Sequence, residues 1–251
     1  MFFAQNLILV EGIAEQLVIP EFASSMGYNL ADSHTSIINI GGRYFNHFLK
    51  LFDTQRSEFA LIKKVACITD LDPVRKNVNS TDWKKCLPIL LNAQSEVYEY
   101  KQTSNLLIEE YINNDEDSFI QLFTQDKGKS STFEYELVLK NPTCEQLVTP
   151  SVSNATEIKD LMKLLKENDP LEKFVTRLGK NKFKDEISNL ITLELLEDSL
   201  NVKQNIIASR YLLSISKGEA AQELAYVINT NDKGLIKPPD YISEAISWIC
   251  R

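Results

Sequence analysis

The sequence lacks the residue sets that build several common sites. Its four cysteines lie far apart with no Cys-x-x-Cys pair, and it holds only two histidines, His34 and His47. These residues cannot complete a zinc site at any usual spacing, so we expect reduced and mostly buried thiols. Any metal ion must therefore be held by oxygen ligands.

Signals for membranes and for nucleotide binding are also missing. No apolar run approaches the roughly 20 residues that span a bilayer, and the first twelve residues carry no basic segment before Glu11, unlike a secretion signal. Gly128-Lys129-Ser130 ends like a P-loop, but Phe123 stands where the first glycine is required. We therefore expect a cytoplasmic chain that has no membrane partner and does not itself bind ATP.

The charge balance is acidic. Lysine and arginine number 27 against 35 aspartates and glutamates, a net charge of -8 over 251 residues. This balance argues against a protein that coats nucleic acid through bulk charge, but it leaves room for a local basic patch or a metal-bridged phosphate contact.

Alternating strand and helix patterns fill the first third of the chain. Apolar segments at 6–10, 35–40 and 64–69 are separated by helical patterns at 13–26 and 44–52. This order predicts βαβ units and a parallel sheet, with ligands bound beyond the carboxyl ends of the strands. Further strands are expected at 95–100 and 118–124 and a helix at 133–140, then a charged helical region, with closing helices at 202–214, 218–228 and 239–248. We accordingly divide the chain into a catalytic core at 1–154, a helical insertion or lid at 155–201, and closing helices at 202–251.

Acidic residues follow the first and third predicted strands. Glu11 ends the first strand, and Glu15 lies one helical turn further on, near the positive end of its helix. Asp70 and Asp72 are two residues apart in a segment that begins as a strand, so both carboxylates are expected on one side. Two such charges about 6 Å apart repel by a few kcal/mol at an effective dielectric near 20. A divalent cation removes this repulsion, and hard oxygen ligands favour Mg²⁺, Mn²⁺ or Ca²⁺.

These motifs resemble a known family in the right order along nearly the whole chain. LILVEGIAE (7–15), IINIGG (37–42) and ACITDLDP (66–73) resemble the TOPRIM domain of topoisomerases, primases and nucleases. The form VEGxxE, then GG, then TDLD resembles the C-terminal TOPRIM nuclease of OLD-family (overcoming lysogenization defect) ATP-dependent endonucleases. STFEYEL (131–137), SKGEAAQELA (216–225) and PPDYISEAISWI (238–249) are similar to later motifs of that family.

The resemblance implies an α/β TOPRIM (Rossmann-like) fold, a parallel sheet flanked by helices with a helical insertion and C-terminal helices. It also implies a DNA endonuclease or nickase that uses two Mg²⁺ or Mn²⁺ ions per site, with Ca²⁺ as a possible substitute. The metal-binding residues implied are Glu11, Glu15, Asp70, Asp72, Thr132 and Glu134. The catalytic residues implied are Glu11, Asp70, Asp72 and Lys217, with Lys217 stabilising charge on the phosphate.

The resemblance implies partners as well. It suggests defence against phage or foreign DNA together with an ABC-type ATPase domain or subunit, in cis or in trans, and it leaves a homo-oligomer open. The ATPase half that would precede this segment is not in the sequence, and residues 2–4 run directly into the first strand. This start hints at a chain cut from a longer one, but the sequence does not decide the question.

A basic stretch at 173–184 has no acidic residue. It could grip DNA phosphates without reading sequence, or it could be a solvated helix face. Its cationic residues are Lys173, Arg177, Lys180, Lys182 and Lys184.

Two alternatives to a DNA nuclease stay open. The chain could be an assembly or sensor module that binds metal weakly and does not cut alone. It could also be another TOPRIM enzyme that acts on RNA, although the zinc-binding cysteines usual in primases are lacking. Cleavage assays with and without the ATPase, and with RNA in place of DNA, separate these functions.

Overall fold

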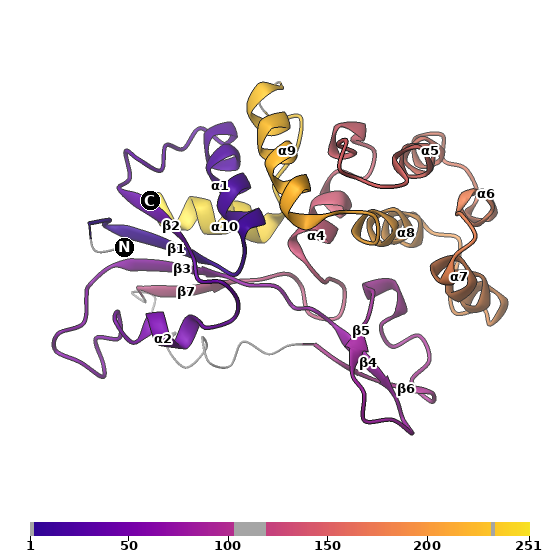
Figure 1. Ribbon diagram of the computed structural model, residues 1–251, viewed down its shortest axis with the longest axis horizontal. Coiled ribbons are helices and arrows are strands. Elements are labelled where there is room, and N and C mark those ends of the chain that lie inside the picture. Colours follow the sequence, from indigo (N-terminus) through magenta and orange to yellow (C-terminus); the bar gives the residue numbers. More distant parts are fainter. Residues whose placement is uncertain (1–2, 103–118, 232–233) are drawn as a thin grey trace. The chain divides into compact units, whose positions relative to one another are not determined.

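A computed structural model of the protein describes residues 3–102, 119–231 and 234–251 (Figure 1). The chain forms two compact units, each built from segments that are distant in sequence. The sheet unit comprises Met1–Asp70, Ser104–Gln125 and Leu224–Arg251, and the helical unit comprises Leu71–Thr103 and Asp126–Glu223.

The sheet unit contains a four-stranded parallel sheet in the order β2-β1-β3-β7. Its strands are β1 (Asn6–Val10), β2 (Thr35–Asn39), β3 (Lys64–Ile68) and β7 (Ile120–Phe123). Its helices are α1 (Ile13–Ser25), α2 (Phe45–Leu49) and α10 (Asp240–Ile249). Val10 is level with Asn39 on one side and with Ile68 on the other, so the carboxyl ends of three strands meet at one edge.

Helices cover both faces of this sheet, as Figure 1 shows, with α1 and α10 on one face and α2 on the other. Leu7, Leu9, Val65 and Cys67 belong to one buried cluster with the apolar residues of α2. Because side chains alternate along a strand, the residues between them face α1 and α10. Burial on both faces explains why β1 and β3 read as continuous apolar runs.

The helical unit contains a small antiparallel sheet in the order β5-β4-β6 and five helices. Its strands are β4 (Val74–Asn77), β5 (Lys84–Lys85) and β6 (Tyr98–Lys101). Its helices are α4 (Phe133–Lys140), α5 (Ala155–Lys166), α6 (Leu171–Arg177), α7 (Lys182–Thr192) and α8 (Leu200–Leu212), with short 3-10 turns at Pro88–Leu90 and Glu145–Leu147. Helix α9 (Lys217–Thr230) begins in this unit and ends in the sheet unit.

The fold class expected from the sequence is confirmed: a parallel sheet flanked by helices, with C-terminal helices. The strands expected at 6–10, 35–40 and 64–69 are β1, β2 and β3, and the helix expected at 133–140 is α4. The segment expected as a strand at 95–100 overlaps β6, which begins at Tyr98 and pairs in the small antiparallel sheet. The strand expected at 118–124 is β7, and residue 118 lies outside the described residues. The division at residues 154 and 201 stays a prediction.

All four cysteines are free thiols, and Cys67 and Cys86 are buried. Burial raises the pKa of the Cys67 thiol, and burial above all raises that of Cys86 to about 11. Both thiols are therefore protonated at neutral pH, as the sequence predicts for reduced core cysteines. Among the described residues, no helix is both long enough and apolar enough to cross a membrane.

Candidate active site

Glu11 lies at the carboxyl end of β1, where neighbouring backbone and side-chain groups hold its carboxylate. The Thr69 hydroxyl donates a hydrogen bond to Oε1, and the Asp70 N–H donates to the same atom at 3.2 Å. The Arg43 Nε lies 3.4 Å from Oε2. These contacts fix Glu11 beside the residues that follow β3, because β1 and β3 are adjacent strands.

Glu15 lies in the first turn of α1 and is buried. A Cβ atom at Gly12 would lie only 3.2 Å from Glu15 Oε2, so this carboxylate folds back over the Gly12 backbone. The unpaired N–H groups at the start of a helix favour a negative charge in this position. Glycine at position 12 therefore leaves the space that the Glu15 carboxylate occupies.

The turn after β2 brings a cation to the same edge of the sheet. Gly41 and Gly42 have φ values of +69° and +132°, which an L side chain rarely adopts, and the Gly42 N–H donates to the Glu11 carbonyl at 2.9 Å. Arg43 follows directly and donates to the carbonyl of Asp70 as well as pairing with Glu11. The motif patterns do not identify Arg43, although its place directly after the two glycines was a usable signal.

Asp70 is positioned by residues from two other elements of the sheet unit. Gln125, which follows β7, donates from Nε2 to Asp70 Oδ1 at 2.5 Å and to the Tyr241 hydroxyl of α10 at 3.0 Å. Gln125 is buried, so its amide is fixed. Neither Gln125 nor Tyr241 is predicted from the sequence, because each lies far from Asp70 along the chain.

The helical unit holds the remaining predicted residues. Asp72, Thr132 and Lys217 line one cavity of about 240 Å³ in this unit. The Asp72 N–H donates to the Ser131 carbonyl at 3.4 Å, and Asp72 has a φ of +38°. Because β3 ends at Ile68, the strand alternation expected to place Asp72 does not extend to it.

Helix α4 begins beside this cavity. Glu134, in its first turn, is buried and forms an ion pair with Lys217, whose Nζ lies 3.0 Å from Oε2. The Thr132 hydroxyl is buried and has no hydrogen-bond partner among the described residues. Glu136, two residues beyond Glu134 on α4, accepts a hydrogen bond from the Ser130 hydroxyl.

The predicted metal-binding residues are thus divided between the two units. Glu11, Glu15 and Asp70 belong to the sheet unit, while Asp72, Thr132 and Glu134 belong to the helical unit. Among the described residues, no group of three or more His, Cys, Asp or Glu side chains is arranged to hold a metal ion.

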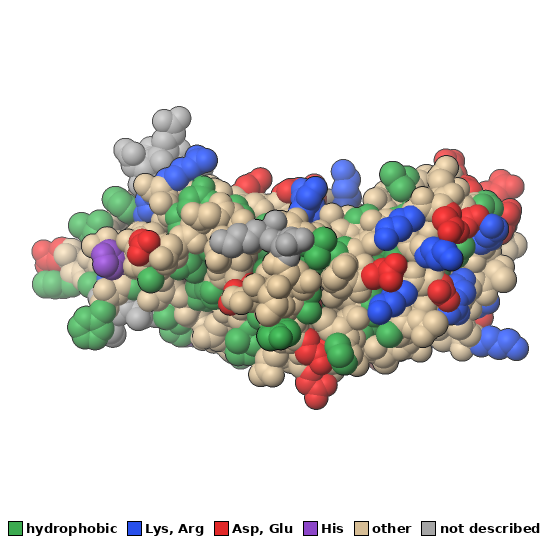
Figure 2. Space-filling model, turned by 90° about the horizontal axis from the view of Figure 1, so that it is seen from above, with side chains coloured by type: hydrophobic (Ala, Val, Ile, Leu, Met, Phe, Trp, Pro, Cys, Tyr) green, Lys and Arg blue, Asp and Glu red, His purple; other side chains and the backbone are tan. Residues whose placement is uncertain are grey.

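The predicted basic stretch divides into paired and unpaired cations. Lys173 pairs with Asp169, the Arg177 Nε donates to Asp160 at 2.7 Å, and the Lys184 Nζ donates to the Leu178 carbonyl at 2.9 Å. Lys180 and Lys182 are exposed, and neither has an ion-pair partner in the described part of the chain. Figure 2 accordingly shows cationic and acidic side chains interleaved on the surface of the helical unit.

The sheet unit is an α/β arrangement with a glutamate after β1 and an aspartate after the adjacent strand β3, and a TOPRIM-like fold has this arrangement. The family described as "Overcoming lysogenization defect protein-like, TOPRIM domain" matches residues 2–72, which confirms the resemblance to OLD-family TOPRIM domains.

Two solved structures are similar to the chain along nearly its whole length. The C-terminal region of the Burkholderia pseudomallei OLD protein is 20% identical, with a TM-score of 0.51, and the match covers 99% of this chain and 98% of that chain. The C-terminal region of the Xanthomonas campestris pv. campestris OLD protein is 18% identical, with a TM-score of 0.47, and the match covers 100% of this chain and 96% of that chain. The Burkholderia structure shows a shared fold. A search of curated proteins gave no match.

Proposed function

We propose that this chain is the metal-dependent DNA endonuclease module of an OLD-like defence system, acting with an ABC-type ATPase. One observation carries the proposal: Glu11 and Asp70 lie at adjacent strand ends, held by Thr69, Arg43 and Gln125. These partly buried contacts hold two carboxylates in place, and both carboxylates lie within the segment that matches the OLD-like TOPRIM family.

The residues present suit Mg²⁺ or Mn²⁺. The donors are carboxylates and a hydroxyl, which such hard cations prefer. Thr132 supplies an independent sign, because a buried hydroxyl with no partner costs about 1–3 kcal/mol. Bound divalent ions would lower the pKa of a metal-bound water, so that it ionises to the nucleophile, and would neutralise charge on the leaving oxygen. The residues that would hold them are Glu11, Glu15, Asp70, Asp72, Thr132 and Glu134.

The chain's own side chains have separate roles in this proposal. Gln125 orients the Asp70 carboxylate through one amide hydrogen, and Arg43 offsets the charge of Glu11. Lys217, held by Glu134, carries a positive charge that would stabilise the phosphate as negative charge develops on its oxygens. The five lysines and arginines of 173–184 are candidates for contacts to the DNA backbone.

Metal dependence provides the direct test of this function. Purified chain incubated with supercoiled plasmid should produce nicked or linear DNA with Mg²⁺ or Mn²⁺, and none with EDTA. Agarose gels measure both products. Cutting that persists in EDTA would exclude a metal mechanism, and cutting of structured RNA but not plasmid would favour an RNA enzyme. Cutting that appears only after the ATPase is added would favour an assembly or sensor module.

Gly12→Ala tests the position of the Glu15 carboxylate. The added methyl group would meet Glu15 Oε2 at 3.2 Å and displace it, so the Mn²⁺ concentration that gives half-maximal cleavage should rise about tenfold. The control is the same change in a Glu15→Ala background, where no carboxylate remains to displace and the effect should vanish. An equal effect in both backgrounds would show that Gly12 acts through the backbone alone.

A further inference from the structure

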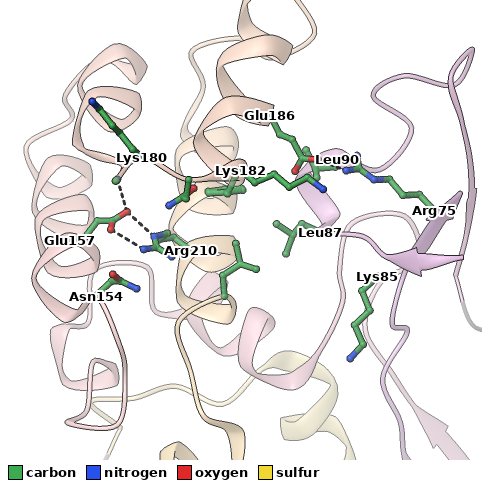
Figure 3. Close-up of a pocket in the computed structure, with 14 residues that line it drawn as sticks. Arg75, Lys85, Leu87, Leu90, Asn154, Glu157, Lys180, Lys182, Glu186 and Arg210 are labelled. Carbon is green, nitrogen blue, oxygen red and sulfur yellow. Dashed lines mark hydrogen bonds and ion pairs between the residues drawn. The ribbon is translucent and has the colours of Figure 1, made fainter. Parts of the chain in front are cut away.

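The largest described cavity of the helical unit is lined by cations from strands and helices that are distant in sequence. It has a volume of about 540 Å³, and five cationic side chains and two carboxylates line it. We call it the cationic pocket; its cationic residues are Arg75, Lys85, Lys180, Lys182 and Arg210. Figure 3 shows Arg75 and Lys85 on the strand side, Lys182 extending in from the helix side, and Lys180 at the rim with its ammonium group directed outward.

Both carboxylates of the pocket form ion pairs with arginines. Glu157 accepts two hydrogen bonds from Arg210, at 2.7 Å and 2.9 Å. Glu186 pairs with Arg75, and although burial lowers the pKa of Arg75, this ion pair raises it overall, so the guanidinium stays charged. Within each of these two ion pairs the carboxylate cancels the charge of the arginine, so neither pair adds net charge to the pocket.

Three lysines remain as uncompensated charge. Lys85, Lys180 and Lys182 are exposed, and none has an ion-pair partner among the residues that the structure describes. These three ammonium groups give the lining a local positive charge, in a chain whose net charge is -8. An anionic ligand would compensate this charge, so the pocket favours an anion.

The pocket suits a chain of phosphates better than a nucleobase. The aromatic ring in its lining, that of Phe183, is only 5% exposed and offers no free face for stacking. Flexible lysine ammonium groups contact phosphates as point charges and carry no sequence information. The lining therefore fits the sugar-phosphate backbone and predicts binding that is independent of sequence.

The pocket also adjoins the candidate active site within the same unit. Lys85, Leu87 and Leu213 line both the cationic pocket and the smaller cavity that contains Asp72 and Lys217. We propose that the cationic pocket binds backbone phosphates of the nucleic acid that is cut, a proposal that rests on the nuclease function above. The cationic pocket differs from the basic stretch at 173–184 in two ways. It includes Lys85 from β5, and it leaves out Lys173, Arg177 and Lys184, whose cationic groups contact Asp169, Asp160 and the Leu178 carbonyl.

Salt-dependent binding without cleavage tests this pocket. Fluorescence anisotropy with a labelled 20-base-pair DNA duplex in EDTA gives affinity at several KCl concentrations. The triple variant Lys85→Gln, Lys180→Gln, Lys182→Gln should bind the duplex at least about tenfold more weakly. Its plot of log K against log salt should have a slope that is less negative by roughly 3. The matched control changes three exposed lysines of α5 by the same charge: Lys159→Gln, Lys163→Gln and Lys166→Gln.

The outcomes separate this proposal from the nuclease proposal. An unchanged slope in the pocket variant, or an equal loss in the α5 control, would overturn the pocket even if the parent chain cuts DNA. Displacement of the duplex by polyglutamate as readily as by unlabelled DNA would also overturn it, because the pocket would then be a general acidic-polymer site. A double-stranded RNA arm that binds with the same slope would support the backbone assignment.

Discussion

Replacing Asp70 by asparagine is expected to reduce plasmid cleavage by on the order of 1000-fold, which corresponds to about 4 kcal/mol of transition-state stabilisation. Asparagine keeps the Oδ1 atom that accepts the Gln125 hydrogen bond, so the local structure should persist. The negative charge is lost, and with it the attraction for a divalent cation. Glu11→Gln should have a similar effect. Glutamine keeps an oxygen toward Thr69 and Asp70, so the structure should persist, but it also removes the negative charge.

Cleavage rates at saturating Mn²⁺, measured together with thermal unfolding, check this prediction. Asp32→Asn is the matched control, because Asp32 is exposed in the same unit and outside the site. It should cut like the parent chain. If Asp70→Asn or Glu11→Gln kept a tenth of the activity or more, the proposed carboxylates would not be catalytic. A lower melting temperature with either variant would indicate a structural role instead.

Glu157→Gln is expected to destabilise the helical unit by about 3 kcal/mol. Glu157 on α5 and Arg210 on α8 form a buried pair, with side chains only 10% and 9% exposed. Removing one charge leaves the other buried without compensation, which costs about 3–5 kcal/mol in comparable pairs. Urea-induced unfolding measures the loss, and replacing both partners by methionine should recover most of it. The control is Glu167→Gln, whose pair with Lys163 is exposed and should cost less than about 1 kcal/mol.

The destabilisation by Glu157→Gln should depend on pH. Burial raises the pKa of Glu157, but hydrogen bonds from Arg210 and the Gly179 N–H outweigh it, so the pKa is below its ordinary value of 4.5. A lowered pKa in the folded state contributes stability above pH 4.5 that is lost as the pH falls through the folded value. The difference between parent and variant should therefore shrink from pH 7 to pH 3.5. A difference that stays constant over this range would contradict an ionised Glu157.

The sheet unit could be predicted from the sequence because its signals are local. The apolar runs of β1 and β3 are buried on both faces, and each ends at an acidic motif that the family match contains. The antiparallel sheet could not be predicted in the same way. Its strands β4 and β5 read Val-Arg-Lys-Asn and Lys-Lys, with no apolar alternation to mark them.

The supporting residues of the site escaped prediction for a different reason. Arg43 and Gln125 contact Glu11 and Asp70 across the sheet, and nothing in their local sequence marks these contacts. For the basic stretch at 173–184, the local sequence suggests more free cations than the structure has. It contains no acid, but Asp160 and Asp169 lie before it and pair with Arg177 and Lys173. Only contacts between elements show which of its lysines are available for a ligand.

The proposed nuclease function requires divalent ions beside Glu11 and Asp70. A crystal of the chain soaked in Mn²⁺, with anomalous data collected at the manganese edge, tests this requirement most directly. We expect two peaks roughly 3.5–4 Å apart, contacted by the carboxylates of Glu11 and Asp70. The absence of manganese beside Asp70 would contradict a metal-dependent nuclease.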